Sequence, residues 1–164
     1  MRGSRCGEPA RVTTDGELFA PERVCLKLNA ATSEEVLAEL ASLLGGRDPG
    51  IAEIIRDGMA AREVVCSTTI GGGVAFPHAR VEGVTAVRAA FVRTAEPVPF
   101  GAADGLPVDL FVGVVGRFPP RAQLISTLSR LLWIFRTEAS REWFRQETDP
   151  ARIVQGFSRV TATE

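Results

Sequence analysis

The segment 106–115 constrains the fold of this chain more than any other stretch. Its sequence, LPVDLFVGVV, is almost wholly apolar after Asp109. Such a composition is typical of a strand that is buried on both faces of its sheet. The segment therefore predicts a sheet with a covering layer on each side. The chain has 164 residues, which is enough for one domain with a substantial core.

Helix signals flank this strand on both sides in the sequence. Thr32 and Glu35 form a capping-box pattern, and apolar residues then recur at helical spacing up to Gly45-Gly46. Asp48-Pro49 predicts the start of a second helix. Its expected buried stripe is Ile51, Ile54, Ile55 and Met59. Three more helices are predicted. The first begins at Pro119-Pro120, and its core stripe is Leu124, Ile125, Leu128, Leu131, Leu132 and Phe135. The second carries Trp143 and Phe144, and the third begins at Asp149-Pro150.

Strands are predicted at 22–29, 73–76 and 84–94, in addition to 106–115. The segment 97–101 contains two prolines and is not expected to form a central strand, because proline donates no backbone hydrogen bond. This order of elements predicts a single α/β domain, with a mixed β-sheet flanked by α-helices on both faces. We expect the domain to occupy residues 16–160 and a flexible N-terminal segment to occupy residues 1–15.

Composition excludes several classes of function. The net charge of −1 provides no electrostatic reason to expect nucleic acid as a partner, and no apolar run is long enough to insert into a membrane. Three widely spaced cysteines without a CxxC pair are typical of reduced thiols in the cytoplasm. With a single histidine we expect no metal site. No dinucleotide fingerprint or P-loop is present, so we expect no cofactor.

The only histidine, His78, follows three glycines in the segment 66–80, CSTTIGGGVAFPHAR. The glycines predict a turn that lets the backbone pass close to another group. Hydrogen bonds within the loop are expected of Ser67, Thr68 and Thr69. The residues alone leave three roles open for His78: a general base, a nucleophile that carries a group covalently, or a buried structural side chain.

A longer pattern surrounds this histidine. It consists of Arg62-Glu63, Ser67-Thr68, Gly71, Gly73, Val74-Ala75-Phe76, Pro77-His78-Ala79-Arg80, Asp104-Gly105-Leu106-Pro107-Val108 and Leu128-Ser129-Arg130-Leu131. The pattern resembles that of the enzyme IIA domains of the phosphotransferase system (PTS), of the fructose, mannitol and nitrogen-regulatory type. The resemblance spans about residues 20–158.

The resemblance implies a phosphocarrier. A phosphohistidine carrier protein of the HPr or NPr kind would donate a phosphoryl group to His78. The group would then pass to an enzyme IIB, or its presence would signal to a regulatory target. Arg62 is the family-matched arginine that would stabilise the phosphoryl group. Arg80 is a further candidate, and its alternative role is a solvated loop charge. The face around the loop is expected to be partly apolar, because it would dock a carrier protein.

The chain departs from this family at one position. Members usually carry a second histidine before the long helix, and that position falls at Arg121 here. An arginine there could donate hydrogen bonds but could not accept a proton. This departure favours a nitrogen-regulatory role over sugar transport. The alternative is a regulatory binding module of the same fold with little or no phosphotransfer, and a hydrolase lacks a matched nucleophile. Catalytic turnover and oligomeric state are left open.

Overall fold

Strand β6 (Val108–Arg117) lies inside a six-stranded mixed sheet. The computed structural model describes residues 17–118 and 122–161. The strand order is β1-β5-β6-β3-β2, and β4 also pairs with β6. The other strands are β1 (Val24–Leu28), β2 (Thr69–Gly71), β3 (Val74–Ala75), β4 (His78–Val81) and β5 (Arg88–Val98). Every residue of β6 is buried except Asp109 and Arg117, as the apolar composition of this segment predicted.

Strand β6 has different neighbours on its two edges. It pairs antiparallel with β5, which in turn pairs parallel with β1. Strands β3 and β4 both pair with it in parallel, at Leu110–Phe111 and at Val114–Arg117 respectively. The two short strands are therefore successive pieces along β6, separated by Phe76 and Pro77. Pro77 has no N–H to donate and interrupts the ladder between them.

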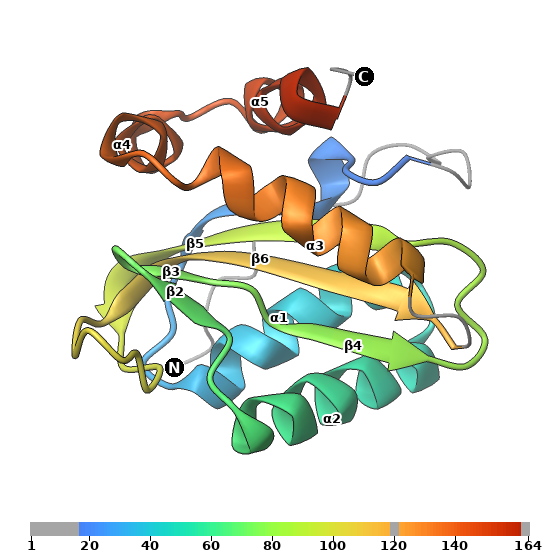
Figure 1. The fold of residues 1–164 in the computed structure, drawn as a ribbon. Coiled ribbons are helices and arrows are strands. Elements are labelled where there is room, and N and C mark those ends of the chain that lie inside the picture. The colour runs from blue at the N-terminus through green and yellow to red at the C-terminus, as the bar shows by residue number, and fades with distance from the viewer. Residues whose placement is uncertain (1–16, 119–121, 162–164) are drawn as a thin grey trace.

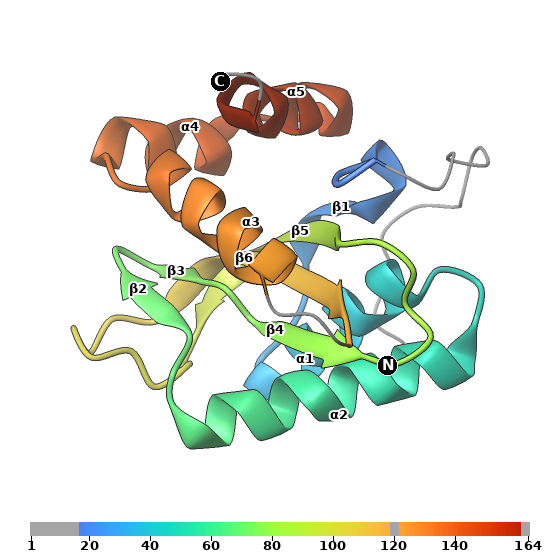
Figure 2. The same ribbon diagram turned by 45° about the vertical axis from the view of Figure 1, so that its right-hand side comes forward.

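Helices cover both faces of the sheet (Figures 1 and 2). Helices α1 (Ser33–Gly45) and α2 (Pro49–Val65) lie on one face. The other face is covered by α3 (Ala122–Ile134), with α4 (Glu138–Gln146) and α5 (Pro150–Thr161) beyond it. A 3₁₀ turn, η1 (Pro21–Arg23), precedes β1. The predicted fold class is confirmed.

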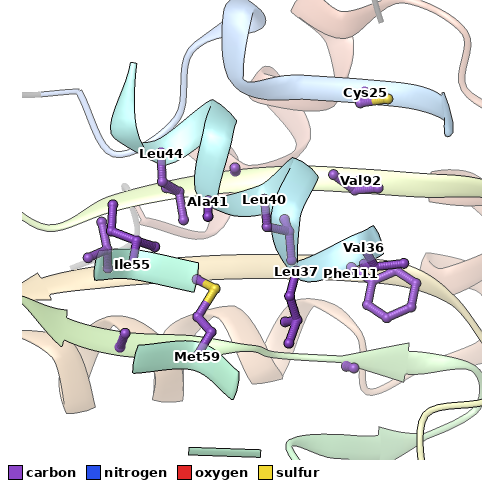
Figure 3. Close-up of a cluster of buried hydrophobic side chains, with 14 of the residues drawn as sticks. Cys25, Val36, Leu37, Leu40, Ala41, Leu44, Ile55, Met59, Val92 and Phe111 are labelled. Atoms are coloured by element: carbon purple, nitrogen blue, oxygen red, sulfur yellow. The ribbon is translucent and has the colours of Figure 1, made fainter. Parts of the chain in front are cut away.

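The core has one cluster on each side of the sheet. On the α1/α2 side, Leu40, Leu44, Ile55, Met59 and Phe111 are fully buried (Figure 3). Burial of each such side chain contributes about 1.5–3 kcal/mol. On the α3 side, buried aromatic rings join the three C-terminal helices to the sheet; they are Phe76, Phe91, Phe135, Phe144 and Phe157.

Local start signals are confirmed. Thr32 and Glu35 form the capping box of α1, with the Thr32 hydroxyl accepting from the Glu35 N–H and the Glu35 carboxylate accepting from the Thr32 N–H. The Asp48 carboxylate accepts from the N–H groups of Gly50 and Ile51 at the start of α2. These bonds satisfy N–H groups that have no partner within the helix.

The strand predictions require three corrections. Strands β2 and β4 were not predicted, and His78 begins a strand instead of lying in a loop. Strand β5 begins at Arg88 and runs through Pro97 to Val98. This proline is tolerated because pairing with β1 ends at Thr94 and pairing with β6 is irregular between Arg93 and Val98. A missing N–H therefore breaks no regular ladder here.

Two predicted core stripes were too wide. Ile54 of α2 is 52% exposed and Ile125 of α3 is 57% exposed, and Leu132 is also exposed. Both helices meet the sheet over a narrower face than the apolar pattern indicated. The described part of α3 begins at Ala122, so the predicted start at Pro119-Pro120 lies outside the described residues. The predicted N-terminal segment 1–15 lies outside them as well.

Cys66 is free and exposed, in agreement with the expectation of reduced thiols. Cys6 lies outside the described residues. Across residues 17–118 and 122–161, no helix is long and apolar enough to cross a membrane.

Candidate functional site

His78 is the first residue of β4, directly opposite Val114 of β6. Side chains alternate between the two faces of a strand. Ala79 and Val81 pack into the core beneath α1 and α2. His78 and Arg80 consequently project from the opposite face, beside the start of the described part of α3.

A cleft of about 390 Å³ opens at this point, between α2, β4 and α3. Its lining residues are Gly58, Arg62, His78, Ala79, Arg80, Phe118, Leu124, Ile125 and Leu128. Gly58 allows α2 to lie close to β4, because a Cβ at that position would be 3.0 Å from the Ala79 Cβ. The cleft therefore has cationic groups around one imidazole and an apolar wall formed by α3.

The His78 ring is held by one backbone group. Its Nδ1 lies 2.8 Å from the carbonyl oxygen of Phe76. A carbonyl can only accept, so Nδ1 carries the proton and Nε2 of the neutral ring has a free lone pair. Burial lowers the pKa of His78, and the charge of Arg62 lowers it further; the Phe76 bond and Glu63 oppose this shift. The neutral, nucleophilic form is thus favoured at neutral pH.

The structure brings together three of the four predicted site residues. Arg62 stands in the last turn of α2, where its Nη1 donates to the carbonyl of Cys66 at 2.9 Å. The Arg80 guanidinium carbon lies 5.2 Å from the centre of the Phe118 ring, a cation–π arrangement. Both arginines line the cleft with His78. The fourth predicted residue, Arg121, lies outside the described residues.

The three glycines form a turn outside the cleft. Gly71, Gly72 and Gly73 have φ angles of 86°, 64° and 78°, and they form the turn between β2 and β3. The Gly72 N–H donates to Asp104, so it is not free to bind a phosphoryl group. None of the three glycines lines the cleft. The prediction of a backbone that passes close to another group is confirmed: a Cβ on Gly72 would lie 2.7 Å from Arg141 Nε, and a Cβ on Gly73 would lie 2.7 Å from Arg145 Nη2.

Arg145 was missed by the sequence analysis. From α4 it donates two bonds to the Asp109 carboxylate, at 2.8 and 2.9 Å, and one to the Gly72 carbonyl at 2.7 Å. Asp109 interrupts an otherwise apolar strand, which was the one visible signal. Its partner is 36 residues away, and no local pattern identifies it.

The loop between α2 and β2 contains internal hydrogen bonds, as predicted. The hydroxyls of Ser67 and Thr69 are 2.9 Å apart. Thr68 instead bonds to Glu63 through both its N–H and its hydroxyl. In the described part of the chain, no cluster of three or more histidine, cysteine or acidic residues could hold a metal ion.

Known structures and sequences resemble this chain over most of its length. A crystal structure of the nitrogen regulatory protein IIA-Ntr from Neisseria meningitidis superposes with a TM-score of 0.80 at 29% identity, covering 87% of this chain and 97% of that one. A nitrogen regulatory protein of Bradyrhizobium diazoefficiens is 27% identical over 90% of this chain and 96% of its own length. One from Pseudomonas aeruginosa is 34% identical over 57% of this chain; that match spans 62% of the Pseudomonas protein.

The fold and the cleft define an α/β domain in which one histidine, His78, lies in a cleft with Arg62 and Arg80. The family model for the phosphoenolpyruvate-dependent sugar phosphotransferase system, EIIA 2, matches residues 17–160. The chain therefore belongs to this EIIA family, and the predicted resemblance is confirmed. Proteins of this family act within a phosphotransferase system.

Proposed function

We propose that this protein is a regulatory phosphocarrier that accepts a phosphoryl group on Nε2 of His78. The observation that carries the proposal is the 2.8 Å bond between Nδ1 and the Phe76 carbonyl. It leaves Nε2 as the nitrogen with a lone pair, inside a cleft that also contains Arg62 and Arg80. The donor would be a phosphohistidine carrier protein of the HPr or NPr kind.

In the transfer step, the Nε2 lone pair attacks phosphorus and a new P–N bond forms. The P–N bond to the donor imidazole breaks, and that ring leaves with the bonding electrons. Nδ1 keeps its proton, and the Phe76 carbonyl continues to accept from it. Arg62 and Arg80 would neutralise charge on the phosphoryl oxygens through their N–H donors.

Exposed apolar side chains at the mouth of the cleft fit the docking of another protein. Phe118 and Ile125 line the cleft and are at least half exposed. On α2, Ile54 is exposed one turn before Gly58, and Val64 and Val65 are exposed at the helix end. An apolar centre with polar groups around it is typical of transient interfaces. The same face would dock the donor and, in turn, an enzyme IIB or a regulatory target.

A nitrogen-regulatory role is favoured over sugar transport. The chain has one histidine, so no second imidazole can assist the transfer. Signalling tolerates slower transfer than metabolic flux does. Two relatives that cover most of their own length are named as nitrogen regulatory proteins. Because the proposed donor and acceptor are soluble proteins, we place this chain in the cytoplasm.

The proposal is tested by incubating the protein with phosphorylated carrier protein and measuring incorporation by mass spectrometry. We expect one acid-labile phosphoryl group on the wild type and none on His78→Ala. Arg62→Lys should slow the transfer, since a lysine cannot present two parallel donors. Arg56→Lys is the matched control, because Arg56 is on the same helix and pairs with exposed acids.

Absence of incorporation with cognate phosphorylated carriers would refute phosphotransfer. The same protein could then act as a binding module, and a pull-down with the carrier would distinguish the two functions. Arg121→His tests the second-histidine position. Faster transfer is expected if that residue replaces the family's second histidine, and an unchanged rate would contradict the alignment.

A further inference from the structure

Both oxygens of the Glu63 carboxylate accept hydrogen bonds from one loop residue, Thr68. Oε1 accepts from the Thr68 N–H at 2.8 Å, and Oε2 accepts from the Thr68 hydroxyl at 2.6 Å. Thr68 is buried, although it is a polar residue in a loop. Bonds to an ionised acceptor are shorter and stronger than neutral ones. The loop is therefore fixed at Thr68 to the last turns of α2.

From Thr68 the hydrogen bonds continue to the histidine. The Thr68 carbonyl accepts from the Phe76 N–H at 3.0 Å, and the Phe76 carbonyl lies 2.8 Å from His78 Nδ1. Phe76 is itself immobilised, because its ring is buried edge-on against Phe135. Beyond it, the Pro77 carbonyl accepts from Val114 of β6 at 2.9 Å. The group that selects the His78 tautomer is thus held from α2 and from β6.

We propose that Glu63 is a positioning residue for His78, acting through Thr68 and Phe76. It holds the Phe76 carbonyl where His78 must keep its proton on Nδ1 and present Nε2 to the phosphoryl donor. Two neighbouring residues of α2 would then act differently. Arg62 would contact the phosphoryl group, and Glu63 would hold the loop between α2 and β2 that positions His78. This inference rests on the proposed function and names the residue that sets its geometry.

A glutamine could keep both contacts, because its oxygen can accept from the Thr68 N–H and its NH₂ group can donate to the hydroxyl oxygen. Glu63→Met removes both acceptors at a similar side-chain length. Thr68→Val removes the hydroxyl while preserving size and the backbone N–H, and Thr68→Ser restores the hydroxyl. Ser67→Ala is the matched control, since it removes a neighbouring hydroxyl that bonds only within the loop.

The first readout is the imidazole ¹⁵N NMR spectrum. His78 is the only histidine, so every ring signal belongs to it. We expect the Nδ1–H tautomer to dominate in the wild type, in Ser67→Ala and in Thr68→Ser. In Glu63→Met and Thr68→Val, the Nε2–H tautomer should gain population. This readout needs no phosphoryl donor, so it stays informative even if the proposed phosphotransfer fails.

The second readout is the phosphorylation rate, with carrier protein and with phosphoramidate as a small donor. Because a small misplacement of reacting groups slows chemistry strongly, we expect Glu63→Met and Thr68→Val to lose about 10- to 100-fold in rate with both donors. The KM for the carrier should be unchanged. Thr68→Ser should recover most of the rate.

Two results would overturn the inference. One is a wild-type tautomer ratio in both Glu63→Met and Thr68→Val. The other is a rate loss confined to the carrier protein, which would place Glu63 in docking. If Glu63→Met fails to fold, the Thr68→Val and Thr68→Ser pair decides the outcome. A tautomer shift without any phosphorylation of the wild type would support the hydrogen-bond chain and refute the phosphocarrier.

Discussion

Substitution of Arg145 by alanine should destabilise the fold without altering the chemistry of His78. The Arg145 guanidinium makes two bonds to Asp109 and one to the Gly72 carbonyl, so it joins α4 to β6 and to the β2–β3 turn. The Arg145 and Asp109 side chains are 26% and 21% exposed. Removing the arginine leaves a carboxylate largely out of water and without this partner.

The expected cost follows from that burial. Breaking a fully buried pair costs about 3–5 kcal/mol, whereas exposed pairs contribute about 0–1 kcal/mol. For a pair that is about three-quarters buried, we expect Arg145→Ala to cost about 2–4 kcal/mol. For a domain of this size that corresponds to a fall in Tm of roughly 4–16 °C. Arg56→Ala, which breaks only exposed pairs, should change stability by about 0.5 kcal/mol or less.

Urea unfolding followed by tryptophan fluorescence measures the effect, because Trp143 lies in α4 against Phe144. Phosphorylation of the folded variant by carrier protein should proceed at the wild-type rate, since Arg145 does not line the cleft. A variant of normal stability that loses phosphorylation would refute the reasoning. It would mean that the turn at Gly71, Gly72 and Gly73, which Arg145 contacts, contributes to phosphoryl transfer.

Three further changes have defined outcomes. Because burial lowers the pKa of His78 below its ordinary 6.5, the folded state binds fewer protons than the unfolded state between the lowered pKa and 6.5. Stability should therefore hold above pH 6.5 and fall below it, whereas the phosphorylation rate should fall only when the pH drops below the lowered pKa of the folded imidazole. A histidine NMR titration with a midpoint at or above 6.5 would contradict this. Gly73→Ala should cost about 1–3 kcal/mol in urea unfolding, because φ is +78° and the new Cβ would lie 2.7 Å from Arg145 Nη2. Met59→Ala should cost about 2–5 kcal/mol by the same assay, since Met59 is fully buried, and a loss below about 1 kcal/mol would show that the core collapses around the gap.

Regular, strongly patterned segments were predictable from the residues alone. The apolar run in 106–115 identified β6, and the caps at Thr32 and Asp48 identified the starts of α1 and α2. The apolar faces of α2 and α3 were predicted less well. Periodicity shows which side of a helix is apolar, but how wide a stripe is covered depends on the neighbouring elements. Ile125 lines the cleft and Ile54 is exposed on α2, so neither side chain fills the core.

The sequence by itself determined the layered α/β class, the family, and the choice of His78 and Arg62 as site residues. Each of these rests on local composition, periodicity or a short motif. Only the tertiary structure decided what the glycine turn binds, that β4 carries the histidine, and that Glu63 reaches it through Thr68 and Phe76. These relations join residues whose spacing along the chain carries no signal. They exist because packing of α2, β6 and α4 brings side chains and backbone groups within hydrogen-bonding distance.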